Sequence, residues 1–185
     1  MRRIIACDLD SVMVDTPRYW YEWLEEVTHA GYSYEEVSHM HNFGEIYDPL
    51  MKSHGCVAMD WWRQQWLYQP MKPINNSVEV LTEMSENFDI VVVSASKAAH
   101  FKSKYYWVKH HFPFIKGFYA SKEKGGIRAD IAIDDRNEYL RQYKEYGVTT
   151  VRYQTPHKQA INFTPDKLID SWLDFKEYID FEYKV

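Results

Sequence analysis

The sequence predicts an α/β fold: a doubly wound, Rossmann-like parallel sheet of about five strands, with a small helical cap inserted after the first strand. Three observations lead to this prediction. Short apolar runs alternate with segments of helical periodicity, which indicates βαβ units and a mostly parallel sheet. The runs are apolar throughout, as in strands that are covered on both faces. The length of 185 residues suits one domain with a small insertion.

The expected strands are apolar and rich in β-branched residues, and they lie in residues 3–7, 89–94, 115–120, 130–134 and 148–153. Helical periodicity predicts helices over residues 77–87, 105–111 and 138–146, the last of them ended by Gly147. The segment 165–178 predicts a closing helix, with its inward face formed by Leu168, Trp172 and Phe175.

The segment between residues 17 and 72 departs from this alternation. It predicts helices over residues 18–30, 34–41 and 58–67, contains no convincing strand, and concentrates Trp, Tyr and Phe. We therefore expect an α/β core domain formed by residues 1–16 and 73–185, and a helical cap insertion formed by residues 17–72.

Composition limits the class of protein. The net charge of −5 argues against a stable nucleic-acid complex, because phosphate backbones favour an excess of Lys and Arg. The aromatic fraction of 17% exceeds what a small core usually holds, so some rings are expected to line a pocket or a surface, which would permit a homodimer. The two cysteines and the lack of a signal or membrane-spanning segment predict a cytoplasmic protein with free thiols.

Polar side chains stand where the predicted strands end. The carboxyl ends of parallel strands meet at one edge of the sheet, and ligands of open α/β sheets bind there. We therefore expect one cluster, which comprises Asp8, Asp10, Ser94, Lys124, Asp134 and Asp135.

Four carboxylates in one cleft repel one another, and a hard divalent cation relieves that repulsion. Magnesium prefers a few carboxylates together with water and phosphate oxygens. A lysine and a metal would neutralise a phosphate, one carboxylate could attack phosphorus, and a second could act as acid and base. Each motif alone has an ordinary structural interpretation, since Asp-x-Asp is usually a turn and Asp-Asp is often a helix cap. Only their joint position predicts a site.

Four ordered motifs resemble those of the haloacid dehalogenase (HAD) superfamily. They are Asp8-Leu9-Asp10-Ser11-Val12, Val93-Ser94, Lys124 and Ile133-Asp134-Asp135. The resemblance implies that Asp8 is the nucleophile and Asp10 the general acid/base. It implies that Mg²⁺ is held by Asp8, the backbone carbonyl of Asp10 and Asp135, with Asp134 in support. It also implies that phosphate is bound by Ser94 and Lys124.

Within the superfamily, the chain resembles the 5′(3′)-deoxyribonucleotidases along nearly its whole length, most clearly at residues 70–74, 103–108 and 124–136. The similarity implies that Lys104 is a second basic residue near the phosphate and that Arg136 flanks the site. There are two departures from the family pattern. Ser11 replaces the usual glycine, and Ala95 stands where a second hydroxyl is common, although its backbone N–H could still bind phosphate.

Nucleotidases of this kind stack the base on aromatic side chains of the cap, and a base–aromatic stack contributes about 1–3 kcal/mol. The candidates here are Phe43, Tyr47, Trp61 and Trp62. For any single ring, packing of the cap against the core is the commoner role, because aromatic side chains dominate cores.

Together these observations predict a Mg²⁺-dependent phosphatase that acts on nucleoside monophosphates through an aspartyl-phosphate on Asp8. Three alternatives stay open at the level of sequence. The first is a phosphatase of another small phosphate ester, such as a sugar phosphate. The second is a polynucleotide 3′-phosphatase, and the third is a non-catalytic protein that binds a nucleotide or a partner chain.

Overall fold

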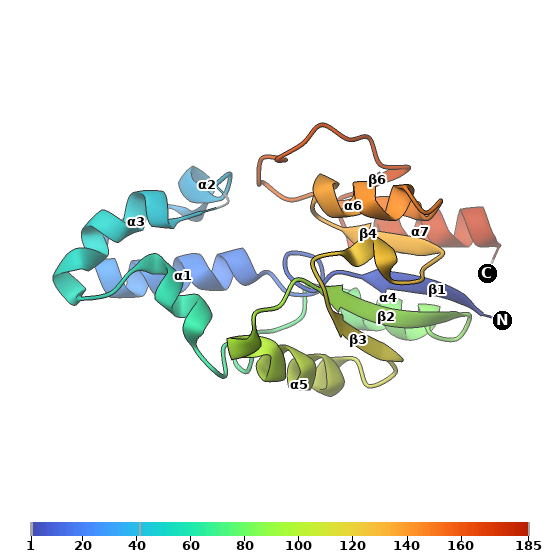
Figure 1. The fold of residues 1–185 in the computed structure, drawn as a ribbon, viewed down its shortest axis with the longest axis horizontal. Helices are drawn as coiled ribbons and strands as arrows, with labels where there is room; N and C mark the ends of the chain where they lie inside the picture. The colour runs from blue at the N-terminus through green and yellow to red at the C-terminus, as the bar shows by residue number, and fades with distance from the viewer. Residues whose placement is uncertain (1, 41, 185) are drawn as a thin grey trace.

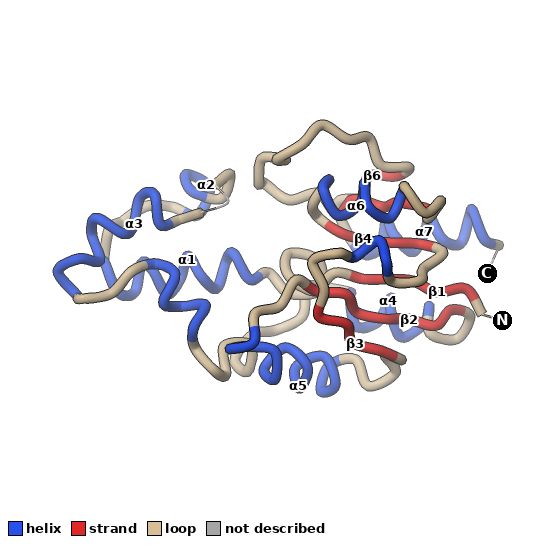
Figure 2. Tube along the Cα trace, viewed as in Figure 1, coloured by secondary structure: helices blue, strands red, loops and turns tan. Residues whose placement is uncertain are grey.

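The computed structural model of the protein describes residues 2–40 and 42–184. Within these residues, six parallel strands form one sheet in the order β3-β2-β1-β4-β5-β6 (Figures 1 and 2). The strands are β1 (Arg3–Cys7), β2 (Phe88–Ser94), β3 (Gly117–Ala120), β4 (Ile131–Asp134), β5 (Thr149–Tyr153) and β6 (Lys167–Ile169). The predicted Rossmann-like α/β fold is confirmed.

The strand order reverses between β1 and β4. The chain first builds β2 and β3 on one side of β1, then returns and pairs β4 with the other side, so that Cys7 lies opposite both Val92 and Ile133. The backbone N–H of Asp8 donates to the carbonyl of Ile133 over 2.9 Å, which continues this pairing past the end of β1. The residues that follow β1 and β4 are therefore neighbours at the switch point, where open α/β sheets bind ligands.

Helices cover both faces of the sheet. The helices α4 (Ser77–Met84), α5 (Phe101–His111) and α7 (Trp172–Tyr183) contribute to the larger apolar core, which also contains Ile5 and Cys7 of β1. The helix α6 (Asn137–Lys144) covers the opposite face, where Tyr143 packs with Ala6 and its neighbours. Alternate residues of β1 thus enter separate cores, which is why the strand is apolar throughout.

A group of helices lies beyond the carboxyl ends of the strands, on the left of Figure 1. It comprises α1 (Thr16–Thr28), α2 (Tyr34–Val37), α3 (Gly44–Met51) and two 3₁₀ turns, η1 (Lys52–His54) and η2 (Ala58–Arg63). The carboxylate of Asp15 caps α1 by accepting from the N–H of Arg18 over 3.2 Å, and Pro17 suits the first turn of the helix.

The predicted closing helix over residues 165–178 was wrong in its first half. Residues Lys167–Ile169 form β6 and pair with β5, and Leu168 is exposed, whereas Trp172 and Phe175 are buried as expected. The helix begins at the cap Ser171, whose hydroxyl accepts from the N–H of Asp174 over 3.1 Å. A free edge of the sheet at β5 gives the preceding segment a pairing partner, and local periodicity does not reveal that partner.

The insertion also differs from its predicted helices. The helix α3 was missed because Gly44 and Pro49 disfavour a helix, and the predicted helix 58–67 is only the 3₁₀ turn η2. Near the end of that turn, the carbonyl of Trp62 lies 3.0 Å from Nδ1 of His100 instead of continuing a helical ladder. The predicted helix 34–41 ends at Val37, and His41 lies outside the described residues.

No helix within residues 2–40 and 42–184 is both long enough and apolar enough to cross a bilayer.

Candidate active site

The first two aspartates are held by a tight turn after β1. The N–H of Met13 donates to the carbonyl of Leu9 over 2.9 Å, and the N–H of Ser11 donates to the carbonyl of Val14 over 2.8 Å. Ser11 has a φ of 64°, the left-handed conformation that a side chain disfavours by about 1–2 kcal/mol. The departure from glycine at this position is therefore a strained one. The turn presents the carboxylates of Asp8 and Asp10 to the same cavity.

Lys124 pairs with two buried carboxylates. Its Nζ lies 2.7 Å from Oδ1 of Asp8 and 2.6 Å from Oδ2 of Asp134, and Lys124 is fully buried. Burial alone would lower the pKa of Lys124, but the charges of Asp134 and Asp8 raise it above its usual value. Lys124 enters from the turn η4 (Lys124–Gly126), which lies against α6. A Cβ at Gly125 would come within 2.5 Å of the backbone carbonyl of Gln142, so this approach requires glycine.

Three buried carboxylates, those of Asp8, Asp134 and Asp135, offer oxygens that all lie within 4.8 Å of one another. Burial and the charges of Asp134 and Asp8 raise the pKa of Asp135 well above its usual range. Burial and the Asp8 charge, opposed by Lys124, raise the pKa of Asp134 to about 7. Lys124 and the N–H of Arg136 already bond Asp134, whereas Asp135 faces the cavity. This donor set fits Mg²⁺, because a hard cation relieves the repulsion that burial imposes.

Each carboxylate oxygen of Asp10 has its own donor. The hydroxyl of Tyr68 donates to Oδ1 over 2.5 Å, and Nζ of Lys104 donates to Oδ2 over 2.5 Å. The Nζ of Lys104 also donates to the hydroxyl of Ser94 over 2.8 Å. Burial by itself would raise the pKa of Asp10, but the charge and hydrogen bond of Lys104, joined by the hydrogen bond of Tyr68, hold it below its usual value.

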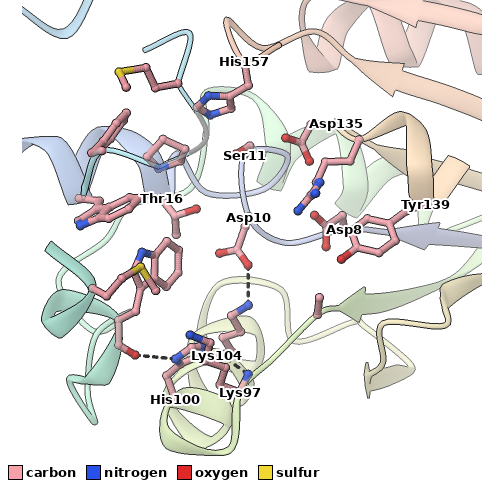
Figure 3. Close-up of a pocket in the computed structure, with 18 of the residues that line it drawn as sticks. Asp8, Asp10, Ser11, Thr16, Lys97, His100, Lys104, Asp135, Tyr139 and His157 are labelled. Atoms are coloured by element: carbon pink, nitrogen blue, oxygen red, sulfur yellow. Dashed lines mark hydrogen bonds and ion pairs between the residues drawn. The ribbon is translucent and has the colours of Figure 1, made fainter. Parts of the chain in front are cut away.

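These groups open into a cavity of about 270 Å³ between the sheet edge and the helical insertion. Figure 3 shows Asp10 directed toward Lys104, with Asp8 and Asp135 beside it and His157 near Ser11. The polar floor of the cavity includes Asp8, Asp10, Lys104, Lys124 and Asp135. Its apolar wall comes from the insertion and includes Trp20, Met40, Phe43, Met59 and Trp62.

The rings of this wall pack edge to face and tilted. The centroid of Trp20 lies 4.8 Å from that of Phe43 and 5.7 Å from that of Trp62. Trp20 and Phe43 are buried, whereas Trp62 keeps part of its surface exposed. Trp62 is therefore the ring with a surface left to receive a flat ligand.

The structure brings most of the predicted site residues together. The following line the cavity: Asp8, Asp10, Phe43, Trp62, Ala95, Lys104, Lys124, Asp135 and Arg136. Ser94 and Asp134 are buried behind this lining and bond to the two lysines. Tyr47 and Trp61 do not line the cavity. The hydroxyl of Tyr47 donates to Oε1 of Glu25 over 2.5 Å, and Trp61 is buried against Trp62 and Trp20.

Two residues next to the catalytic candidates, Tyr139 in the cavity lining and Tyr68 behind it, gave no signal in the sequence. Tyr139 lies on α6, and two cationic side chains face its ring. Nζ of Lys124 is 4.2 Å from the ring centroid, and Cζ of Arg136 is 5.2 Å from it. Its helical spacing from Arg136 could have placed it near the site. Tyr68 comes from the segment that leaves the insertion, where no motif marks it.

His157 reaches the cavity from the β5–β6 connection (residues 154–166), the long loop that arches toward α2 in Figure 1. The Gln159 side chain fixes this connection beside the Asp135 loop. Its Nε2 donates to the carbonyl of Asp135 over 3.0 Å, and its Oε1 accepts from the N–H of Asn137 over 2.8 Å. The N–H of Lys158 donates to the carbonyl of His39 in the insertion over 3.3 Å. The connection thus touches both sides of the cavity.

The sequence of the chain is similar to those of known proteins. Residues 2–184 match the family described as 5′ nucleotidase, deoxy (pyrimidine), cytosolic type C. The chain is 22% identical over 178 residues to a 5′(3′)-deoxyribonucleotidase of Bacillus subtilis, which covers 88% of this chain and 91% of that one. It is 25% identical over 139 residues to the human mitochondrial 5′(3′)-deoxyribonucleotidase. That match covers 70% of this chain and spans 60% of the human protein.

Solved structures share the fold. The HAD-hydrolase YfnB from Bacillus subtilis, in a crystal structure bound to magnesium, superposes with a TM-score of 0.66 at 14% identity, over 97% of this chain and 99% of that one. The L-2-haloacid dehalogenase from Xanthobacter autotrophicus superposes with a TM-score of 0.61 at 9% identity, over 98% of this chain and all of that one. At such identities the likeness establishes the fold alone.

Proposed function

The chain belongs to the cytosolic type C family of 5′ nucleotidases within the HAD superfamily, and on that premise we propose that it hydrolyses deoxyribonucleoside monophosphates with Mg²⁺, through an aspartyl-phosphate on Asp8. The membership makes it a phosphoric monoester hydrolase of the nucleotidase type. The single observation that carries the proposal is the pair Asp8 and Asp10 at one cavity, each beside its own buried lysine.

The proposed first step forms one bond and breaks another. A carboxylate oxygen of Asp8 attacks phosphorus, the bond from phosphorus to the nucleoside oxygen breaks, and Asp10 gives that oxygen a proton. Asp10 is ionised while Lys104 bonds it, so it first takes up this proton from the arriving phosphate monoester or from water, as the phosphate draws Lys104 away. Lys124, which already contacts Asp8, would oppose the negative charge that gathers on the phosphoryl oxygens.

The second step returns the enzyme to its starting state. The ionised Asp10 takes a proton from a water molecule, whose oxygen attacks phosphorus and releases Asp8. Phosphate leaves, and Asp10 again carries the proton. The residues that would hold Mg²⁺ are Asp8 and Asp135, supported by Asp134 and by the backbone carbonyl of Asp10. Bound there, Mg²⁺ would supply charge stabilisation to the transferring phosphoryl group.

We further propose that residues 17–72 act as a cap that selects the nucleoside. The base would stack on the exposed part of Trp62, with Phe43, Trp20 and the two methionines of the wall forming the rest of its pocket. Arg136 flanks the phosphate end, and the N–H of its Nε is buried without a hydrogen-bond partner among the described residues. The same premise favours a pyrimidine base, which the family description names.

A panel of phosphate esters tests this function. Phosphate release should be measured with deoxyribonucleoside 5′- and 3′-monophosphates, a sugar phosphate and a 3′-phosphorylated oligonucleotide, each with Mg²⁺ and with EDTA. We expect turnover of the deoxyribonucleotides with Mg²⁺ and its loss with EDTA. A preference for the sugar phosphate or the oligonucleotide would reject the proposed substrate class. No turnover of any ester would reject the proposed phosphatase activity.

The mechanism is tested by Asp8→Asn and Asp10→Asn, both of which should abolish phosphate release. Asp89→Asn is the matched control. Asp89 is the second residue of β2, at the opposite end of the strand from the site, and it pairs with Arg2. Full activity in either site variant would overturn the aspartyl-phosphate mechanism.

A further inference from the structure

Tyr68 holds one oxygen of Asp10 from a part of the chain that contains no motif. Its side chain is fully buried, and its hydroxyl donates to Oδ1 of Asp10 over 2.5 Å. An un-ionised phenol is the state of tyrosine near neutral pH, so Tyr68 is the donor and the carboxylate the acceptor. Hydrogen bonds to a charged acceptor are about twice as strong as neutral ones, and this one fixes the rotation of the carboxylate.

The other oxygen of Asp10 is held by a group that the reaction would use. Oδ2 accepts from Nζ of Lys104 over 2.5 Å, and Ser94 lies 3.5 Å from it. Lys104 lines the cavity, so an incoming phosphate can compete for its ammonium group. If Lys104 turns to the phosphate, Oδ2 is released and Oδ1 stays bonded to Tyr68. The two oxygens of Asp10 are therefore not equivalent.

Tyr68 itself is anchored on α5, next to Lys104. Its backbone N–H donates to the hydroxyl of Ser103 over 2.8 Å, and its ring lies 5.4 Å from Nζ of Lys104. One turn further along α5, Nε1 of Trp107 donates to the carbonyl of Met71 over 2.9 Å. Both ends of the segment 68–71 are thus hydrogen-bonded to the core helix α5, which fixes the position of Tyr68.

We propose that Tyr68 is a positioning residue for the acid/base Asp10: it holds Oδ1 so that Oδ2 is the oxygen that gives the proton to the leaving nucleoside and later takes one from water. This inference rests on the proposed function. Tyr68 touches neither the phosphate nor the nucleoside in this arrangement, because it does not line the cavity. Its contribution belongs to the transition state, where the proton moves, and not to substrate binding.

The test removes the hydroxyl and compares two leaving groups. A nucleoside alkoxide needs a proton to leave, whereas p-nitrophenolate is a stable anion that leaves without one. The rate of leaving-group release in the first turnover should be measured for Tyr68→Phe with a deoxyribonucleotide and with p-nitrophenyl phosphate. This step precedes hydrolysis of the aspartyl-phosphate, so slow later chemistry does not mask the result.

For the nucleotide, we expect this rate and kcat to fall by about 10- to 100-fold with little change in KM, since general acid–base catalysis contributes about 10²–10⁴. For p-nitrophenyl phosphate, we expect the first-turnover rate to fall by less than about threefold. Tyr21→Phe is the matched control. It removes another tyrosine hydroxyl, which donates to the carbonyl of Tyr32 over 2.6 Å in the insertion, away from the cavity.

An equal loss with both substrates, or a change in KM alone, would overturn the proposal, since either indicates a structural or binding role. If Tyr68→Phe fails to fold, Ser103→Ala loosens the anchor of Tyr68 and should give a smaller selective loss with the nucleotide. No selective loss in that variant would also reject the proposal. A wild-type protein without activity toward either ester would reject the proposed function itself, whereas an active wild type with an unaffected Tyr68→Phe would reject only this inference.

Discussion

Trp61 and Trp62 are adjacent in the sequence and lie in different surroundings. Trp61 is 4% exposed and packs against Trp20, whereas Trp62 lines the cavity and keeps part of its surface open. The sequence alone does not show which of the two rings is buried and which lines the cavity. The direction of each side chain from a short 3₁₀ turn separates them, so one has a structural role and the other can meet a ligand.

Trp62→Ala should raise KM for a deoxyribonucleotide by roughly tenfold or more, because a base–aromatic stack contributes about 1–3 kcal/mol. The KM for a sugar phosphate, which has no base, should stay the same. Steady-state kinetics with both esters measure the difference.

Trp61→Ala is the matched control for that experiment. It should lower the free energy of unfolding by about 3–5 kcal/mol, as for other buried aromatic residues, and leave KM nearly unchanged in the folded protein. A similar rise in KM for the base-free ester in Trp62→Ala would contradict the stacking role.

At the scale of elements, the carboxylate of Asp166, just before β6, adds side-chain bonds to the backbone pairing of β6 with β5. Asp166 accepts from Nζ of Lys144 on α6 over 2.6 Å, and from the N–H and the hydroxyl of Thr150 on β5 over 2.8 Å each. Burial alone would raise the pKa of Asp166, but the hydrogen bonds of Lys144 and Thr150 outweigh it and lower the pKa below its usual value. The edge strand therefore depends on an ionised side chain.

Asp166→Asn should lower the free energy of unfolding at pH 7 by about 1–2 kcal/mol, a figure reduced for the partial exposure of the pair. Since the folded pKa lies below the unfolded value of about 3.9, the stabilisation is complete above that pH and is lost as the pH falls through the folded pKa. The difference between variant and wild type should therefore shrink below about pH 4.

Urea unfolding at pH 7, 5 and 3 measures this dependence. Asp170→Asn, at an exposed carboxylate just after the same strand, is the control and should change stability less. A difference for Asp166→Asn that stays constant down to pH 3 would argue against an ionic role for Asp166.

At the scale of the whole molecule, the fold brings three carboxylates together, and their negative charges repel one another. The carboxylates of Asp8, Asp134 and Asp135 come from two adjacent strands, and one lysine among them contacts Asp8 and Asp134. A cation that binds only the folded state stabilises it by mass action, by about 2.7 kcal/mol at a concentration 100 times Kd. Binding of Mg²⁺ to these carboxylates would therefore stabilise the whole folded chain.

Adding Mg²⁺ should raise Tm by several degrees relative to EDTA at matched ionic strength, since 1 kcal/mol shifts Tm by about 2–4 °C for a chain of this size. Asp135→Asn should remove this rise, and should itself raise Tm without metal because it relieves the repulsion. Differential scanning calorimetry gives both values. If Mg²⁺ raises the Tm of Asp135→Asn as much as it raises the Tm of the wild type, then Mg²⁺ binds elsewhere.

Local sequence patterns were enough to predict the strands that carry the site and the residues at the ends of these strands. Five of the six strands were predicted within about two residues, and Asp8, Asp10, Lys124 and Asp135 line one cavity as the parallel sheet requires. These features are readable because they are local: an apolar run marks a buried strand, and the residue after it must stand at the edge of the sheet.

The surroundings of those residues could not be predicted in this way, because they are formed by long-range packing. In the folded chain, Tyr68 bonds Asp10, and Trp62 but not Trp61 lines the cavity. The segment before α7 pairs with β5. Each of these depends on contact between residues far apart in the sequence, for which local periodicity holds no information. The sequence identified the carboxylates of Asp8 and Asp10, whereas the packing of distant segments determined that Tyr68 bonds one oxygen of Asp10 and Lys104 the other.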